Sequence, residues 1–140
     1  MIVLDTNVVS ELMRLEPAVA IFTWFSRQLP NEVFTTSVTE AEIFYGIELL
    51  AAGKRRKSLL DAAETMFTKV FAGRILVFDS DAARAFAKLA ADARRLGRPR
   101  SHADTQIASI TLARGARLAT HNVADFRDWE LELIDPWKES

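Results

Sequence analysis

Residues 1–7 read MIVLDTN, a short aliphatic run that ends in a carboxylate followed by two polar residues. Such a run predicts a short buried strand over residues 2–4. A charge placed deep in an apolar core needs a partner, and in open α/β sheets ligands bind at the carboxyl ends of the strands. Asp5, which directly follows the strand, is therefore the first candidate for a functional residue.

Short aliphatic runs alternate with longer stretches of helical periodicity along the rest of the chain. Strands are predicted at 2–4, 33–35, 75–78, 117–119 and 131–134, and helices at about 7–14, 17–28, 38–51, 55–72, 81–96 and 102–114. No linker, repeat or low-complexity stretch interrupts residues 1–140, so a single domain is expected. The alternation predicts an α/β fold with a mainly parallel sheet covered by helices on both faces.

Composition narrows the class of protein. The 140 residues are 49% hydrophobic and 26% charged, which is typical of one globular domain with a proper core. No apolar run approaches the roughly 20 residues that cross a bilayer, so we expect a cytoplasmic protein without a membrane segment. The absence of cysteine excludes disulfides, thiolate nucleophiles and zinc held by cysteine. With a net charge of -1, only local basic patches could attract nucleic acid.

Two further acids, Glu42 and Asp104, fall in the first turns of predicted helices, where they could meet Asp5. Ser37 and Glu40 have capping-box spacing, which gives Glu40 a local role and leaves Glu42 available for another. Two like charges about 4 Å apart cost roughly 4 kcal/mol at an effective dielectric near 20, so the cluster needs protons or a cation. Oxygen ligands favour Mg²⁺ or Mn²⁺, ions that support hydrolysis of phosphodiesters.

Each acid also has an ordinary structural interpretation. Asp5 could cap a helix, and Glu42 could be a surface glutamate. Asp104 follows Ser101 at capping-box spacing, so it could be a capping partner. The three acids together nevertheless favour a shared site, because one arrangement of the sheet would account for all of them.

Four segments resemble PIN-domain nucleases, most closely toxins of the VapC and FitB type. They are residues 3–7, 39–46, 101–108 and 120–126, and the likeness extends to residues 134–137, essentially the whole chain. The resemblance implies a three-layer α/β/α sandwich and a Mg²⁺- or Mn²⁺-dependent ribonuclease, the toxin of a type II toxin-antitoxin system. It also implies inhibition by a small cognate antitoxin of the VapB or FitA kind, which would supply any DNA binding. Family members commonly form homodimers and cut transfer or ribosomal RNA, so both are expected here.

The resemblance also assigns roles to individual residues. Asp5, Glu42 and Asp104 match the three core acids, which are catalytic and hold the metal. Asn122 stands at the fourth acidic position, where it could offer a carbonyl oxygen or a hydrogen bond to metal-bound water, but no charge. Asp125 could compensate from just outside the ligand set.

Polar and basic residues complete the expected site. Thr6 and Thr120 would orient carboxylates or water. His121 stands where many relatives carry Arg, so a phosphate contact there would be weaker and pH-dependent. Other expected RNA contacts come from one basic run: Arg94, Arg95, Arg98 and Arg100. The second run, residues 54–57, is interpreted as a solvated helix end.

Two other functions fit the same residues. A DNA nuclease on the same fold would use the same acids and would differ in having no need for the 2′-hydroxyl. A catalytically silent PIN-like regulator that only binds proteins is suggested by Asn122 alone. The presence of Asp5, Glu42 and Asp104 argues against the silent protein, so the ribonuclease is the leading hypothesis.

Overall fold

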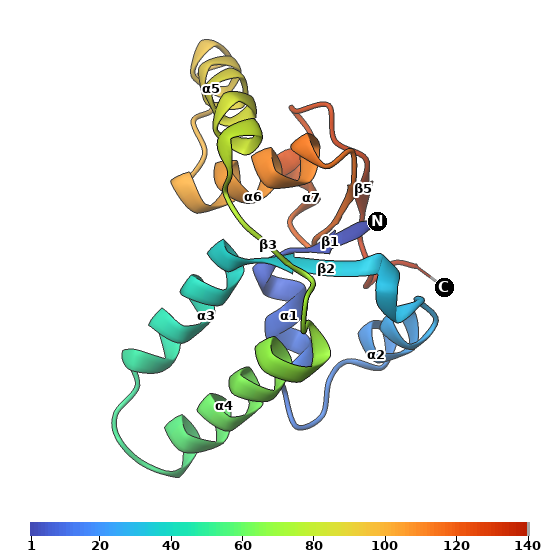
Figure 1. Cartoon of the computed structure of the whole chain (residues 1–140), viewed down its shortest axis with the longest axis vertical. Coiled ribbons are helices and arrows are strands. Elements are labelled where there is room, and N and C mark those ends of the chain that lie inside the picture. Colours follow the sequence, from blue (N-terminus) through green and yellow to red (C-terminus); the bar gives the residue numbers. More distant parts are fainter. Residues whose placement is uncertain (140) are drawn as a thin grey trace.

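Five short strands form the middle layer of the computed structural model, which describes residues 1–139 (Figure 1). They are β1 (Ile2–Leu4), β2 (Val33–Thr36), β3 (Ile75–Leu76), β4 (Arg117–Ala119) and β5 (Leu133–Ile134). Their order in the sheet is β3-β2-β1-β4-β5, and each neighbouring pair is parallel. The prediction of a mainly parallel α/β sheet is confirmed.

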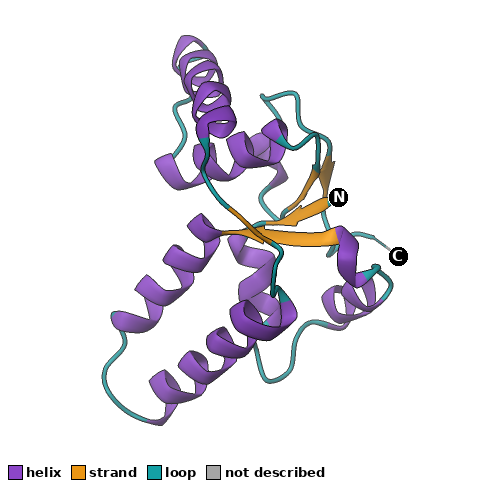
Figure 2. Ribbon diagram, in the orientation of Figure 1, coloured by secondary structure: helices purple, strands orange, loops and turns teal. Residues whose placement is uncertain are grey.

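Helices cover both faces of this sheet (Figures 1 and 2). One face packs against α1 (Thr6–Leu12), α2 (Val19–Ser26), α3 (Ser37–Glu48) and α4 (Lys54–Thr65). The other packs against α5 (Ser80–Arg95), α6 (His102–Ala113) and α7 (Val123–Phe126). The expected three-layer α/β/α sandwich is therefore present. Within the described part of the chain, no helix is both long and apolar enough to span a membrane.

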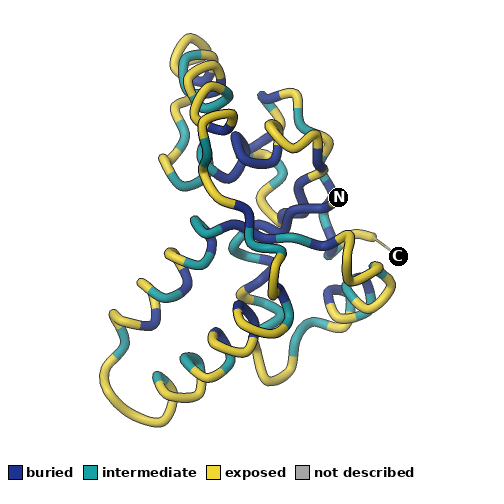
Figure 3. The backbone as a smooth tube through the Cα atoms, viewed as in Figure 1, coloured by how far each residue is buried: buried dark blue, intermediate teal, exposed yellow. Residues whose placement is uncertain are grey.

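The central strand β1 divides two hydrophobic cores. Ile2 and Leu4 belong to the core under α1 to α4, whereas Val3 belongs to the core under α5 and α6. Successive residues of a strand point to opposite faces, so three aliphatic residues in a row fit a strand that is covered on both sides. The dark, buried centre of Figure 3 shows the result. Only the end of β1 can present a polar group.

Strand order brings the ends of β1, β2 and β4 together. The chain passes from β1 to β2 on one side, and β4 pairs with β1 on the other. Asp5 follows β1, α3 follows β2, and Thr120 follows β4, all at the same edge of the sheet. A change of direction in strand order at such an edge opens the crevice in which α/β proteins bind ligands.

Several predicted boundaries were wrong. The single helix expected over residues 55–72 is α4 followed by a π-helical turn, η2 (Met66–Val70). The Phe71 amide donates to the Met66 carbonyl at 2.9 Å, and this wider turn places the Phe71 side chain fully in the core. The strand expected at 75–78 has two residues, and the last strand covers only the end of 131–134. The 3₁₀ turn η1 (Pro30–Glu32) and the short α7 were not predicted.

The start of α3 also differs from the capping box proposed for Ser37 and Glu40. The cap is Thr36, whose hydroxyl accepts from the Thr39 amide at 3.1 Å. Thr36 ends β2 in an extended conformation, which a cap residue requires, so the helix begins one residue earlier than expected. Glu42 is consequently the sixth residue of α3 and lies in its second turn, not its first.

Candidate active site

Asp5 is the most buried acid at this edge of the sheet, with 3% of its surface exposed. Its carboxylate accepts from the Thr6 amide at 2.8 Å, the Thr120 hydroxyl at 2.8 Å and the Asn7 side-chain amide at 3.2 Å. These donors come from α1 and from the end of β4, so the carboxylate joins two neighbouring strands. Thr120 reaches Asp5 through its hydroxyl and Thr6 through its backbone amide, and their supporting roles stay a prediction.

The surroundings of Asp5 disfavour its charge. Burial raises the pKa of Asp5 from its ordinary value of 3.8 to about 6, and the nearby charges of Asp104 and Glu42 raise it as well. The hydrogen bonds from Thr120 and Thr6 oppose this shift but do not cancel it. At neutral pH the folded protein therefore holds an ionised carboxylate that a nearby cation would stabilise.

Glu42 reaches the site from α3 through a hydroxyl relay. The Thr6 hydroxyl donates to the Glu42 carboxylate at 2.6 Å and lies 3.0 Å from the Thr39 hydroxyl. Because Thr6 has one hydroxyl proton and directs it to Glu42, Thr39 must be the donor in the second contact. Glu42 itself is exposed, and its carboxylate faces α1 where that helix starts beside Asp5.

Asp104 lies in the first turn of α6 and is half-buried. Its backbone amide donates to the Ser101 hydroxyl at 3.1 Å, so Ser101 caps the helix as the spacing suggested. Burial raises the pKa of Asp104, followed by the charges of Asp125 and Glu42, whereas Ser101 and Arg100 lower it. Asp104 is thus electrostatically coupled to the other acids, although its backbone serves the cap.

The acids share one region, but their side chains do not form a closed ligand set. Within residues 1–139, no group of three or more His, Cys, Asp or Glu side chains is arranged to hold a metal ion. The donor chemistry nevertheless fits a hard cation, since the donors are oxygens and two of the carboxyls have raised pKa values. To bind an ion, the Glu42 carboxylate would have to give up the hydrogen bond that it accepts from the Thr6 hydroxyl. The metal site therefore remains a prediction.

Asn122 and Asp125 differ in exposure and in the groups that they contact. Asn122 is exposed at the start of α7, where its backbone amide donates to the Thr120 hydroxyl at 3.0 Å and its side chain forms no capping bond. Asp125 acts directly on the charge of Asp104 and lies 3.4 Å from an Arg100 nitrogen. Asp125 therefore supplies a fourth negative charge that Asn122 cannot.

Asn7 is a positioning residue that the sequence analysis missed. Its side-chain nitrogen donates to Asp5 at 3.2 Å and to the Thr120 hydroxyl at 3.4 Å, while its oxygen accepts from the His121 amide at 3.1 Å. One side chain thus ties the segment after β1 to the segment after β4. Its position two residues after Asp5 was the only hint in the sequence, because the sequence does not show that the segment after β4 lies beside it.

Most of the residues expected to contact RNA already have partners within the protein. Arg95 pairs with Asp92, Arg98 with Asp128, and Arg100 with both Asp125 and Asp128, at nitrogen to oxygen distances of 3.2 to 3.7 Å. Within residues 1–139, Arg94 forms no ion pair. The ring centre of His121 lies 4.3 Å from that of Trp137, and its Nδ1 lies 3.4 Å from Asp135. His121 is therefore engaged by the C-terminal segment.

Comparison with known proteins assigns the family. The family model described as PIN domain matches residues 2–129. The chain belongs to the PIN-domain family. The VapC ribonuclease Y4jK of Sinorhizobium fredii is 38% identical over 138 residues, which span 99% of both proteins. The toxin FitB of Neisseria gonorrhoeae is 32% identical over 137 residues, 98% of this chain and 99% of FitB.

Solved structures agree with this assignment. A structure of FitAB bound to an IR36 DNA fragment matches this PIN domain with a TM-score of 0.90 at 31% identity. The match covers 100% of this chain and 98% of the other. The predicted membership among PIN domains of the VapC and FitB type is confirmed.

The raised pKa of Asp5 gives a stability prediction. An acid with a higher pKa in the folded state binds more protons when folded, so its stabilising effect at low pH is lost as the pH rises from about 4 to 6. Relative to the unmodified metal-free protein, the free energy of unfolding of Asp5→Asn should therefore be about 1 to 3 kcal/mol higher at pH 7 than at pH 4. The amide nitrogen of Asn cannot accept the hydrogen bonds made to Asp5, and this cost is the same at both pH values. Urea denaturation at the two pH values measures this difference.

The control for this measurement is Asp61→Asn, the same substitution at an exposed site on α4. It should give no pH-dependent difference of this size. If Asp5→Asn lowers stability equally at both pH values, Asp5 is an ordinary hydrogen-bonded carboxylate and carries no desolvation cost.

Proposed function

We propose that the protein is the toxin of a toxin-antitoxin pair and acts as a metal-dependent endoribonuclease. The observation that carries the proposal is the desolvated Asp5 carboxylate, coupled to Glu42 and Asp104 at the edge where β1, β2 and β4 end. The 38% identity to a VapC ribonuclease over nearly the whole chain supports cleavage of RNA as the reaction.

Asp5, Glu42 and Asp104 are the residues that would hold Mg²⁺ or Mn²⁺. The bound ion would supply an activated water and would neutralise charge on the phosphate. Thr6, Thr120 and Asn7 fix the orientation of the Asp5 carboxylate. Because these donors come from two different strand ends, they keep Asp5 in place when the acids are fully ionised.

The arginines would contribute unequally to RNA binding. An arginine already paired with a carboxylate neutralises a phosphate less effectively than a free one, because it must first leave its partner. Arg94 is exposed and unpaired within residues 1–139, so we assign it the main phosphate contact. Arg98 and Arg100 instead hold the connection between α5 and α6 against Asp128.

A small antitoxin would control this activity. The structure of FitAB on DNA supports a partner of the FitA or VapB kind, and DNA binding would come from that partner. We further propose that the toxin acts in the cytoplasm, where its RNA substrates are, and that it forms a homodimer as expected for this family. A transfer or ribosomal RNA is the proposed substrate.

The proposed activity predicts a simple pattern of cleavage. Purified protein, free of antitoxin, should cut total transfer RNA with Mg²⁺ or Mn²⁺ and should stop when the ion is chelated. Asp5→Asn should lower the rate by about 100-fold or more, because it removes the central ligand. Gel analysis of end-labelled RNA measures the rate.

Two controls define the result. Asp61→Asn should cleave like the unmodified protein, and a DNA of the same sequence should remain intact. Cleavage of the DNA at a similar rate would support the DNA nuclease instead. Equal cleavage by the Asp5→Asn variant would contradict the proposed site, and the absence of both cleavage and cation binding would favour a silent binding protein.

A second prediction separates Asp125 from Asn122. Because Asp125 places a charge beside Asp104, Asp125→Asn should raise the Mn²⁺ concentration for half-maximal cleavage by about tenfold. Asn122→Ala should change it by less than about threefold, since a neutral exposed amide adds no charge. The opposite order would show that Asn122 is the fourth ligand. Cleavage rates across a Mn²⁺ titration measure both.

A further inference from the structure

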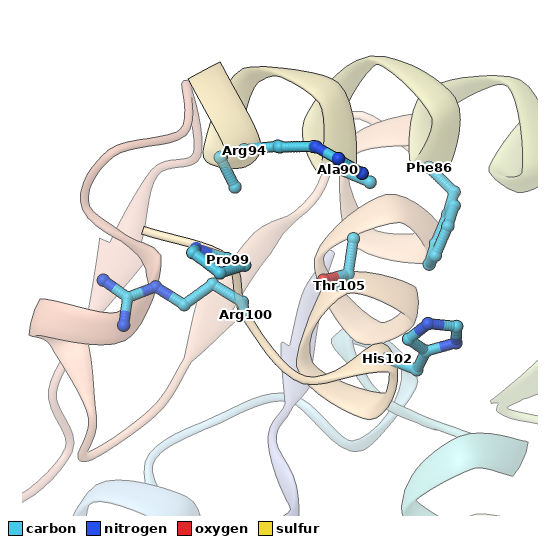
Figure 4. A pocket seen from close by; sticks show the side chains of 8 residues that line it. Phe86, Ala90, Arg94, Pro99, Arg100, His102 and Thr105 are labelled. Carbon is cyan, nitrogen blue, oxygen red and sulfur yellow. The ribbon is translucent and has the colours of Figure 1, made fainter. Parts of the chain in front are cut away.

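A pocket of about 370 Å³ lies between α5 and the first turn of α6 (Figure 4). Its apolar wall is formed by Phe86, Ala90 and Pro99, and its polar rim by Arg94 and His102. The volume falls within the roughly 300 to 1,000 Å³ of small-ligand sites. The pocket is not part of the acidic cluster, and of its lining residues the proposed function gives a role in RNA binding mainly to Arg94.

The aromatic lining suits a flat ring. The ring centres of Phe86 and His102 lie 5.8 Å apart at an interplanar angle of 67°, and the ring centre of Phe78 also lies 5.8 Å from that of Phe86. Figure 4 shows the two rings at one end of the pocket and Pro99 at the other. A nucleobase has the planar, largely apolar faces that such surfaces stack against.

Charge in the pocket favours an anion attached to that ring. Figure 4 shows the Arg94 side chain running along α5 with its guanidinium beside Ala90, whereas Arg100 extends away from the pocket. Arg100 is committed to Asp125 and Asp128. Arg94 has no ion-pair partner within residues 1–139, so its charge is available to a phosphate.

The pocket shares one helical turn with the acidic site. Asp104 lies between His102 and Thr105 in the first turn of α6, and both of these residues line the pocket. Neighbouring residues of a helix point about 100° apart, and one turn rises only about 5.4 Å. His102 and Thr105 therefore face the pocket from one side of α6, whereas Asp104 points about 100° to 160° away from them. An RNA strand that passes over the start of α6 could reach both the pocket and a phosphodiester bond held at Asp104.

We propose that this pocket binds one unpaired base of the RNA substrate, on the same strand as the bond that is cut. The base would lie against Phe86 and His102, and Arg94 would contact its phosphate. This inference rests on the proposed ribonuclease function, which it deepens by naming a subsite. Substrate choice would then depend in part on an exposed base that can enter the pocket.

Two variants test the subsite in different ways. Ala90→Leu fills the pocket, and Arg94→Gln removes the cation while leaving the pocket open. Arg27→Gln is the matched control, since it makes the same charge change at an exposed position that follows α2, a helix on the other face of the sheet. All three are made in the Asp5→Asn protein, so that RNA is bound without being cut.

Binding is measured by fluorescence anisotropy with a labelled single-stranded RNA of about eight nucleotides. Ala90→Leu should weaken binding by about tenfold, because one stacked base is lost. Arg94→Gln should reduce the slope of log affinity against log salt by about 0.7, the value for one phosphate contact on a single strand. Arg27→Gln should leave the affinity close to that of its parent.

An abasic scan gives the decisive comparison. In this scan the bases of the RNA are removed one at a time, and the loss of one particular base should weaken binding to the parent protein. The same loss should have no effect on binding to Ala90→Leu, because base removal and the Leu side chain abolish the same contact. Identical scans for the two proteins would overturn the pocket, as would equal effects of Arg94→Gln and Arg27→Gln. Circular dichroism shows whether Ala90→Leu is folded, and Arg94→Gln still tests the site if it is not.

The outcomes also separate this inference from the proposed function. If the unmodified protein cleaves RNA but the variants bind like their parent, only the subsite is wrong. If the unmodified protein neither binds nor cleaves RNA, the ribonuclease proposal itself fails.

Discussion

The structure depends on one constraint: β1 is buried on both faces, and the charge of Asp5 lies at its end. Ile2, Val3 and Leu4 are each less than 4% exposed, and Asp5 is only 3% exposed. A carboxylate in that position is costly unless donors and a cation compensate it. The surrounding elements meet the first need, since Thr6, Asn7 and Thr120 all donate to it.

The need for a cation explains why Glu42 and Asp104 lie near Asp5. Asp104 and Glu42 raise the pKa of Asp5, so on their own they make the folded protein less stable. Proteins commonly accept such a cost where function requires it. A divalent cation would turn three mutually repelling carboxylates into one stable set of ligands, and Asp125 would add to its attraction. The same acids then explain both the cost and the proposed catalysis.

Much of the fold and the position of Asp5 could be predicted from the sequence, because they depend on local patterns of residues. Three aliphatic residues before Asp5 identified the central strand, and alternation of short and long periodic segments identified the parallel sheet. The role of Asn7 could not be predicted, because it depends on which segments the strand order places side by side. For Asp125 the resemblance suggested a supporting role, but its pairing with Arg100 could not be predicted. The cap at Thr36 and the π turn before Phe71 were missed because tertiary packing decides boundaries of one or two residues. Likewise, Arg94 could be distinguished from Arg95, Arg98 and Arg100 only once their partners were known.

The most direct test of this account is an NMR titration of the Asp5 carboxyl carbon, with and without Mg²⁺. We expect a pKa of about 6 in the metal-free protein and a pKa well below that value when Mg²⁺ is present. A metal-free pKa near 3.8 that Mg²⁺ leaves unchanged would contradict it, because Asp5 would then be neither desolvated nor in contact with a cation.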